Sequence, residues 1–346
     1  MYKWYALKRI LRGVLMYALL IFVFSVLFNS INEQTQRTQI NEQVKMESMG
    51  LTNIRPDQLL IWRETREAQL ISLYRLDRPF GERIIFRTKN ILTFNFGRST
   101  HIKSSKGDQN VLVIILEALP KTMMLFTTAI VFELIIGITL GLLKARKPGG
   151  KLDRSTSFVT MVVYGMPSWW LGMMLILLFV YIFKLFPSGG LVSTPTPSGF
   201  AGFLDRVWHM ILPVTTLVII SFWSLSFVIR NIVLGVLQED YIMSARARGI
   251  GERSILFGHT LRTAAPPIVT MALLSLLVSF SGAIIFEGIF SWPGLGNLYW
   301  IAIQQNDVPV LMGDLAITTG VYLTGLIFLD LIYGFLDPRI KVGGKA

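Results

Sequence analysis

The sequence predicts an all-α integral membrane protein with six transmembrane helices. Hydrophobic residues make up 52% of the 346 residues and charged residues only 16%, and the mean hydropathy is +0.55. A soluble domain of this size carries more charge and alternates apolar with polar residues. Here the apolar residues form blocks, and about 20 such residues in a helix cross the hydrocarbon core of a bilayer. The blocks lie at about 10–28, 111–143, 157–185, 209–232, 268–290 and 311–336.

The first block follows a basic N-terminus, a combination that is also typical of a secretory signal peptide. A signal peptide ends at a small-x-small cleavage site, and the sequence VFSVLFNSINEQ has no clear site of this kind. We therefore expect an uncleaved anchor. Residues 1–28 are interpreted as the N-terminal start and the first transmembrane helix.

Residues 29–110 form the one sizeable region outside the predicted spans. The first half is polar and predicted to be helical, and the second half has apolar residues near helical spacing until Pro79 interrupts them. These apolar residues are Leu59, Leu60, Trp62, Leu70 and Leu73. We expect a small helical cap outside the membrane that packs against the spans.

The remaining five blocks form a predicted core over 111–336. The blocks 111–143 and 157–185 exceed the minimum length, which indicates tilt or a part outside the lipid. Glycine and proline inside them, such as Pro167, are tolerated where helices pack closely. Residues 187–203 are rich in Pro, Gly, Ser and Thr, which predicts an external loop.

Positive charge predicts which side of the membrane each loop faces, because Lys and Arg accumulate in short cytoplasmic loops. The N-terminus and the segments 144–156, 233–267 and 337–346 are all basic, whereas 291–310 contains no Lys or Arg. We therefore expect both termini in the cytoplasm, with 337–346 as a cytoplasmic tail. The same bias accounts for the net charge of +12, so we expect no binding of nucleic acid.

The sequence lacks the motifs of metal binding, of nucleotide binding and of catalysis. The chain has no cysteine, and His101, His209 and His259 lie in different segments without the spacing of metal ligands. No GxxxxGK[ST] phosphate loop occurs, and no Ser/His/Asp set or paired carboxylate marks a catalytic site. We therefore expect no catalytic residue, no metal site and no cofactor bound by this chain.

A polar, helix-forming stretch at 239–262 separates the fourth and fifth apolar blocks. A polar segment of this kind is excluded from lipid, so it is predicted to be a cytoplasmic loop. Asp240 or Ser244 is expected to cap a short helix there. Ala245 and Ala247 allow the surface of another protein to approach closely, which indicates a docking segment. The alternative interpretation is that the segment is a solvated amphipathic connector. Gly249 is expected to end or bend the helix.

The stretch DYIMSARARGIGERSILFGHTLRTAAPPIVT resembles the cytoplasmic "EAA" loop of binding-protein-dependent ABC importer permeases, and more narrowly that of the dipeptide/oligopeptide/nickel family. The matching residues are Asp240, Tyr241, Ala245, Arg246, Ala247, Gly249, His259, Leu261, Arg262, Pro267 and Thr270. Other segments of the family follow in order, including LDRPF at 76–80, FEGIFSWPGLG at 286–296 and DLIYGFLDPRIK at 330–341. The resemblance covers most of the chain from about residue 76.

The resemblance implies the fold of a type I ABC importer permease in the cell membrane of a prokaryote. It implies an extracytoplasmic substrate-binding protein, a second homologous permease subunit, and two ATP-binding subunits that hold ATP and Mg and carry the hydrolysis. It also implies a cytoplasmic coupling helix that docks on an ATPase. The residues assigned to this helix are Asp240, Tyr241, Ala245, Arg246, Ala247, Arg248 and Gly249.

Two further sets of residues are candidates for the pathway or its gate. Glu133 is a charge within an apolar block, and such a charge costs roughly 2.5–3.5 kcal/mol at a helix centre. It either faces the pathway, pairs with another subunit, or lies nearer the membrane interface. The other set lies at the end of the fifth block and just after it, and consists of Glu287, Trp292, Pro293 and Gly294. For the tight turn at 292–294, a structural corner is the alternative to a gate.

The sequence departs from the family pattern in several places. Met243 stands where the general loop motif has glutamate, and Thr263 replaces the usual asparagine. The segment 29–75 is longer than usual and lacks the family's turn after the first span. These departures change what is expected of single contacts and of the external cap. They do not change the assignment of 239–262 as the coupling loop.

The predicted function is that of a permease subunit importing oligopeptides or dipeptides, without enzymatic activity of its own. Oligosaccharides or nickel chelates carried by the same machinery are the alternative substrates. A stand-alone channel or secondary transporter is the rival class, but no inverted repeat with broken helices is evident.

Overall fold

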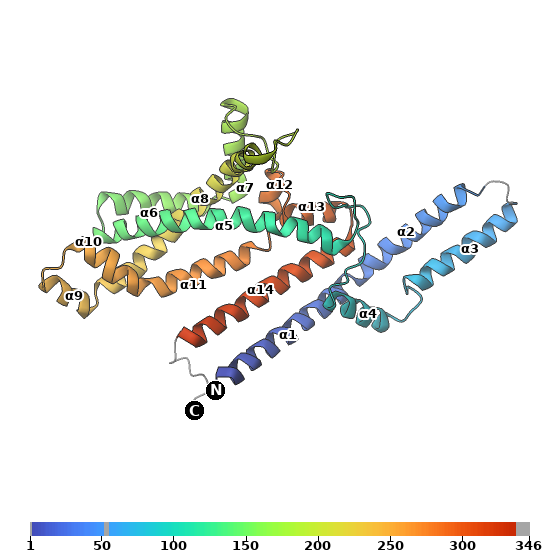
Figure 1. Ribbon diagram of the computed structural model, residues 1–346, viewed down its shortest axis with the longest axis horizontal. Coiled ribbons are helices and arrows are strands. Elements are labelled where there is room, and N and C mark those ends of the chain that lie inside the picture. Colours follow the sequence, from blue (N-terminus) through green and yellow to red (C-terminus); the bar gives the residue numbers. More distant parts are fainter. Residues whose placement is uncertain (1, 52–54, 337–346) are drawn as a thin grey trace. The chain divides into compact units, whose positions relative to one another are not determined.

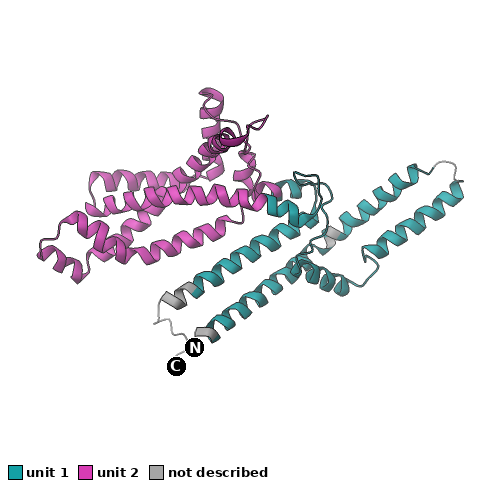
Figure 2. Ribbon diagram, in the orientation of Figure 1, with its two compact units in different colours: residues 1–117, 299–346 teal, residues 118–298 magenta. Residues whose placement is uncertain are grey.

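The computed structural model describes residues 2–51 and 55–336, and helices dominate this range (Figure 1). The predicted cytoplasmic tail, 337–346, lies outside the described residues. The chain divides into two compact units (Figure 2), one of residues 1–117 and 299–346 and one of residues 118–298.

The first unit is built from the N-terminal helices and the last helix. Its helices are α1 (Tyr2–Leu27), α2 (Asn29–Met49), α3 (Pro56–Leu73), α4 (Phe80–Leu92) and α14 (Val308–Leu336). Helices α5 (Val111–Arg146) and α13 (Leu295–Gln304) begin in one unit and end in the other.

Helix α1 packs antiparallel along α14, and both are apolar enough to span a membrane. Arg9 near the start of α1 pairs with Asp330. The Tyr17 hydroxyl donates a hydrogen bond to the carbonyl of Ala316 over 3.2 Å. Between these contacts Gly13 faces Ile327 so closely that a Cβ atom at residue 13 would lie 3.1 Å from the isoleucine Cγ1. A small residue therefore lets the two helices approach, as is usual between membrane helices.

The region 29–110 is helical, as the sequence predicts. Helices α2 and α3 pack together around a small apolar cluster, and α4 packs on α1. The cluster consists of Ile40, Val44, Leu70 and Leu76, with Trp62 and Ile71 at its edge. Of the predicted apolar face on α3, Leu60 and Leu73 are instead 60% and 72% exposed. The cap buries only one narrow stripe, because α2 offers few apolar partners.

A buried carboxylate joins a loop of this unit to the start of α14. Asp307 is fully buried and accepts hydrogen bonds from the Ser99 hydroxyl at 2.5 Å and from the backbone N–H groups of Thr100 and His101 at 3.0 and 3.1 Å. Its other oxygen accepts the N–H of Val310 at 3.4 Å, so it also caps the helix.

The second unit contains the remaining helices. They are α6 (Lys151–Tyr164), α7 (Ser168–Ile176), η1 (Leu177–Ile182), α8 (Gly199–Leu237), α9 (Asp240–Ala247), α10 (Glu252–Ser254), η2 (Ile255–Thr260), α11 (Leu261–Ser279) and α12 (Ile284–Ile289).

Five described helices are long and apolar enough to cross a membrane, and the number is six if the bent pair Lys151–Tyr164 and Ser168–Ile182 counts as one span. The third predicted block lies in this pair, which bends by 96°. Pro167 stands at this break with an extended backbone and begins the second helix. The fifth span ends at Ser279 rather than near residue 290, because the chain turns through Gly282 at a φ of 76°.

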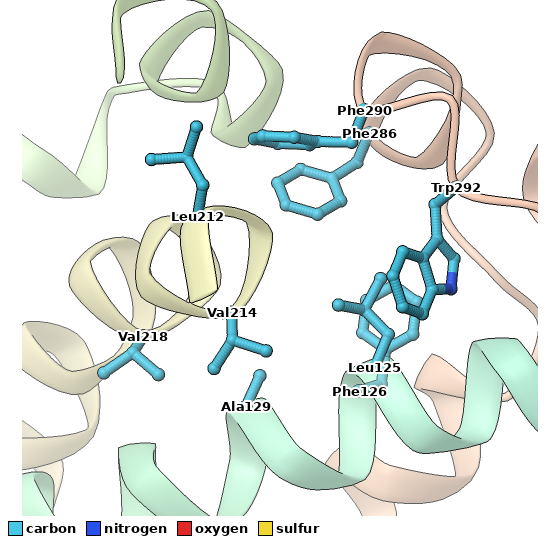
Figure 3. Packing of buried hydrophobic residues seen from close by; sticks show 9 residues of the cluster. All are labelled: Leu125, Phe126, Ala129, Leu212, Val214, Val218, Phe286, Phe290 and Trp292. Atoms are coloured by element: carbon cyan, nitrogen blue, oxygen red, sulfur yellow. The ribbon is translucent and has the colours of Figure 1, made fainter. Parts of the chain in front are cut away.

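The core of the second unit lies where α5, α8 and the segment after α11 meet (Figure 3). Trp292 lies beside Leu125 and Phe126 of α5, while Phe286 and Phe290 lie beside Leu212 of α8. The rings of Phe286 and Phe290 are 5.0 Å apart.

Trp292 belongs to a corner that is bonded to α5. Its indole Nε1–H donates to the carbonyl of Lys121 over 3.1 Å. Thr122 accepts the N–H of Leu295 over 2.7 Å and donates its hydroxyl to Glu287 Oε1 over 3.1 Å. Glu287 is fully buried and also accepts the N–H of Asn297 at 3.3 Å.

Two features show how tightly this corner is closed. A Cβ atom on Gly294 would collide with both Glu287 and Thr122, and one on Gly296 would lie 2.7 Å from the backbone of Ala283. Burial raises the pKa of Glu287 to about 7, although the hydrogen bonds it accepts act in the opposite direction. The donors that bond this carboxyl group, a hydroxyl and a backbone N–H, are uncharged.

A second contact layer joins α5, α6 and α8. A Cβ atom on Gly141 would lie 2.8 Å from Ile229 Cγ2 and 2.9 Å from the carbonyl oxygen of Ser226. Nearby, Arg230 donates both Nε and Nη2 to Asp153, over 3.0 and 2.7 Å. This largely buried ion pair, with Arg230 22% and Asp153 5% exposed, joins α8 to α6.

Gly141→Ala should destabilise the protein, because the added methyl group meets both a side chain and a backbone carbonyl of α8. Overpacking of this kind typically costs about 1–3 kcal/mol. Gly235→Ala is the matched control, since Gly235 is also helical and nothing lies near its Cβ position. The measurement is thermal unfolding of the detergent-solubilised protein, and equal midpoints for the two variants would contradict the close approach.

Glu287→Gln should stabilise the protein at pH 8 but not at pH 5. The pKa of Glu287 is higher in the folded protein than in the unfolded chain. As the pH rises from the unfolded-state pKa towards about 7, the wild type therefore loses folding stability, whereas the Gln variant does not. The full effect is roughly 3 kcal/mol. Unfolding midpoints of wild type and variant at both pH values measure it, and a pH-independent difference would count against a buried carboxyl without a cation.

Candidate functional site

The predicted coupling stretch contains one short helix, α9, from Asp240 to Ala247. Glu239 occupies its cap position without a side-chain hydrogen bond, so the expectation that Asp240 or Ser244 caps the helix is wrong. Asp240 is instead the first helical residue. Its negative charge lies at the positive end of the helix dipole, which is favourable without a specific bond.

Gly249 ends this helix, as predicted. Its φ is 80°, a conformation that glycine adopts without strain. The N–H of Gly249 bonds to the carbonyl of Arg246 over 2.9 Å, and the N–H of Ile250 bonds to the carbonyl of Ala245 over 3.2 Å. These two bonds make a Schellman motif. No atom lies within 4 Å of its Cβ position, so the backbone angle alone calls for glycine.

One face of α9 is buried within the chain. Ile242 and Ala245 pack against Ile255 of η2, with Leu237 and Ile250 at the edge of the cluster. The interpretation of Ala245 as part of an outward contact surface is therefore wrong, since it is only 3% exposed. Its small side chain allows η2 to approach α9.

The opposite face of α9 is open. Met243 is 61% exposed, and Ala247, Arg248 and Gly249 are exposed as well. Arg246 donates to Glu252 of the same loop over 2.8 and 3.3 Å. This face combines small, apolar and cationic groups on a helix whose other side is fixed.

Thr263, a departure from the family pattern, has a partner in this loop. Its hydroxyl lies 2.7 Å from the Tyr241 hydroxyl, so the start of α11 is bonded to the start of α9. Leu256 of η2 lies in a further cluster with Val233 of α8 and Ile268 of α11. The whole loop is thus attached to two membrane-spanning helices.

The candidate gate residues lie in the closed corner described above. Glu287 and Trp292 are fully buried, Gly294 is buried and Pro293 is half-buried. Their geometry accounts for a structural corner in this conformation. The gate assignment itself stays a prediction.

Glu133 lines a cavity of about 380 Å³ within the second unit. The cavity is formed by α5, α6, α8 and α11 and is lined by Ile130, Glu133, Leu134, Val163, Tyr164, Ile220, Ser221, Ser224, Leu225, Val228, Met271, Ala272 and Ser275. Glu133 and Glu287 are therefore parts of different local environments, one facing a cavity and one sealed.

Sequence reasoning missed the polar residues that line this cavity together with Glu133. Ser221 and Ser224 come from α8, Ser275 from α11 and Tyr164 from the end of α6. The available signal was a serine pair three residues apart in the fourth apolar block, which places both on one helix face. Their convergence with Glu133 required the packing of four helices.

Comparison with known proteins places the chain in a family. The model of the "Binding-protein-dependent transport system inner membrane component" family matches residues 137–342. The oligopeptide transport system permease protein AppB of Bacillus subtilis is 32% identical over 79% of this chain and 84% of its own length. The dipeptide transport system permease protein DppB of Escherichia coli K12 is 32% identical over 80% of this chain and 85% of its own.

A third relative, the peptidoglycan transport system permease protein YejB of Agrobacterium fabrum, is 32% identical over 76% of this chain and 72% of its own length. Among solved structures, a chain of the inward-facing MetNI methionine ABC transporter is 17% identical with a TM-score of 0.46, over 62% of this chain and 95% of that one.

The family model spans more than half of the chain, and the sequence relatives cover about four fifths of it. The chain therefore belongs to the inner membrane components of binding-protein-dependent transport systems, as a multi-pass, non-catalytic permease subunit of an ABC importer.

Proposed function

We propose that this permease imports dipeptides or oligopeptides delivered by an extracytoplasmic binding protein. The proposal is supported by the relatives of the chain, which include a dipeptide and an oligopeptide permease. It is also supported by the cavity that contains Glu133, where one carboxylate and four hydroxyl groups line an otherwise apolar space. A peptide needs both kinds of surface, since its ends are charged and its side chains vary.

The assembly in this proposal contains a second homologous permease and two ATP-binding subunits that hold ATP and Mg. This chain has no phosphate loop of its own. The basic N-terminus and the basic loop at 233–267 face the cytoplasm, together with the C-terminus, and 29–110 faces the opposite side.

The exposed face of α9 is the observation that carries the coupling part of the proposal. The helix is fixed on one side by Ile242, Ala245 and Ile255, and it is open on the other. An ATPase that docks on the open face moves α9 and the attached helices as one block. Closure on ATP then shifts the equilibrium between inward-open and outward-open states.

Ala247→Trp should weaken ATPase docking by roughly tenfold or more, because a bulky side chain on a close interface costs at least about 1–3 kcal/mol. Ala247 is exposed and helical, so the fold itself tolerates the change. Co-purification of the ATPase subunits measures docking. Ala201→Trp is the matched control, since Ala201 is an exposed helical alanine at the start of α8. Equal ATPase recovery from both variants would refute the docking face.

Glu133→Gln should lower the uptake of short peptides with a free amino terminus by about tenfold, because a charge-assisted hydrogen bond is worth about 1.5–3 kcal/mol. The measurement is uptake by the complete importer in proteoliposomes. N-acetylated peptides serve as the control, since they lack the ammonium group and should be carried equally by wild type and variant. Preferential uptake of an oligosaccharide or a nickel chelate would contradict the proposed substrate class.

A further inference from the structure

The first unit contains a large cavity that the import mechanism does not use. Its volume is about 750 Å³, within the usual range of ligand pockets. It is lined by α2, the turn after α3, α4, the loop 95–101 and the start of α14. Because several separate segments enclose it, its shape suits a small ligand better than the surface of another protein.

The lining of this cavity is strongly cationic. Four arginines line it, and Glu42 is the one acidic residue among the described lining residues. The arginines are Arg75, Arg83, Arg87 and Arg98. Arg83 pairs with Glu33 over 2.8 Å, but Glu33 also accepts Arg37 at 3.1 Å. One carboxylate thus serves two guanidinium groups, and the cavity keeps an excess of positive charge.

Polar atoms in the cavity wall lack partners within the described part of the chain. Arg87 Nη1, Arg83 Nε and Gln39 Nε2 are buried donors without a hydrogen-bond acceptor. Burial, followed by repulsion from Arg83, lowers the pKa of Arg87 to about 10. The guanidinium group remains charged at neutral pH, and an unpaired buried donor of this kind is costly. An anion in the cavity would remove that cost.

The same cavity offers apolar surface beside the arginines. Phe86 lies under the guanidinium of Arg75, which is 3.9 Å from the ring centroid. Ile91, Phe96 and Met312 add further apolar surface to the lining. A ligand that fits must therefore combine a negative group with an apolar group.

We propose that this cavity binds a small organic carboxylate with an apolar side group, held by the guanidinium groups of Arg87 and Arg83. A planar carboxylate matches the fork of a guanidinium group, which can donate two parallel hydrogen bonds to it. The site is separate from the cavity of Glu133, and it does not depend on which substrate the importer carries.

The test is calorimetric titration of the complete importer in nanodiscs with N-acetyl-Leu-Phe and with its C-terminal amide. The acid should bind saturably and the amide at least about tenfold more weakly, because only the acid forms charge-assisted bonds with arginine. Arg87→Gln should weaken binding of the acid by a similar factor. Arg78→Gln is the matched control, since Arg78 is exposed and lies outside the cavity lining.

Equal binding of the acid and the amide to the wild type would overturn the proposal without recourse to any variant. Binding of the acid that is unchanged in Arg87→Gln would overturn it too, since the probe would then occupy another site such as the pathway. Arg87→Lys tests whether weaker binding comes from the lost guanidinium group or from misfolding. Because lysine keeps the positive charge, this variant should retain part of the affinity for the acid. Its unfolding midpoint should equal that of the wild type.

Discussion

Pairing of charges withdrawn from water is the constraint on which this structure depends. Removing one partner of a buried ion pair costs about 3–5 kcal/mol, so such pairs fix the positions of the helices that carry them. Asp153 and Arg230 join α6 to α8 in this way, whereas Asp307 ties a loop to α14 through hydrogen bonds from a hydroxyl and backbone N–H groups. The carboxyl groups at residues 133 and 287 are arranged differently. Glu287 is sealed among neutral donors, whereas Glu133 lines a cavity with four hydroxyl-bearing residues. An ionisable residue inside a membrane span and beside a cavity is a candidate for contact with the substrate.

The loop between α8 and α11, which carries the proposed docking helix α9, is held by a few contacts of its own. A docking helix must be open to a partner and yet transmit force, so it needs one free face and one fixed face. Ile242 and Ala245 supply the fixed face through η2, and the bond between Tyr241 and Thr263 adds a link to α11. The Schellman end at Gly249 turns the chain back towards that cluster. Force on the open face therefore reaches α8 and α11 through packed side chains rather than through a flexible connector.

The sequence predicted the fold well where apolar length alone decides it. Five spans and the helices of the region 29–110 follow from composition and spacing. The bend at Pro167 and the early end of the fifth span were missed, because an apolar run does not reveal where its backbone turns. Ala245 was assigned to the wrong face, since a small side chain suits a contact within the chain as well as one between chains. The serines that line the cavity with Glu133 could not be assigned to it from the sequence, because their proximity depends on the packing of four helices.

Two arginine ion pairs differ in exposure, and this difference indicates which of them can exchange its partner. Arg246 and Glu252 are 42% and 51% exposed, and a pair of this kind contributes only about 0–1 kcal/mol. Arg230 and Asp153 are 22% and 5% exposed, so their separation would leave a buried carboxylate without its partner. In the proposed docking, an acidic group on the ATPase would replace Glu252 at Arg246 at little cost, while the pair at Arg230 would stay intact. Rearrangement would then be confined to the loop, and the packing between α6 and α8 would be preserved.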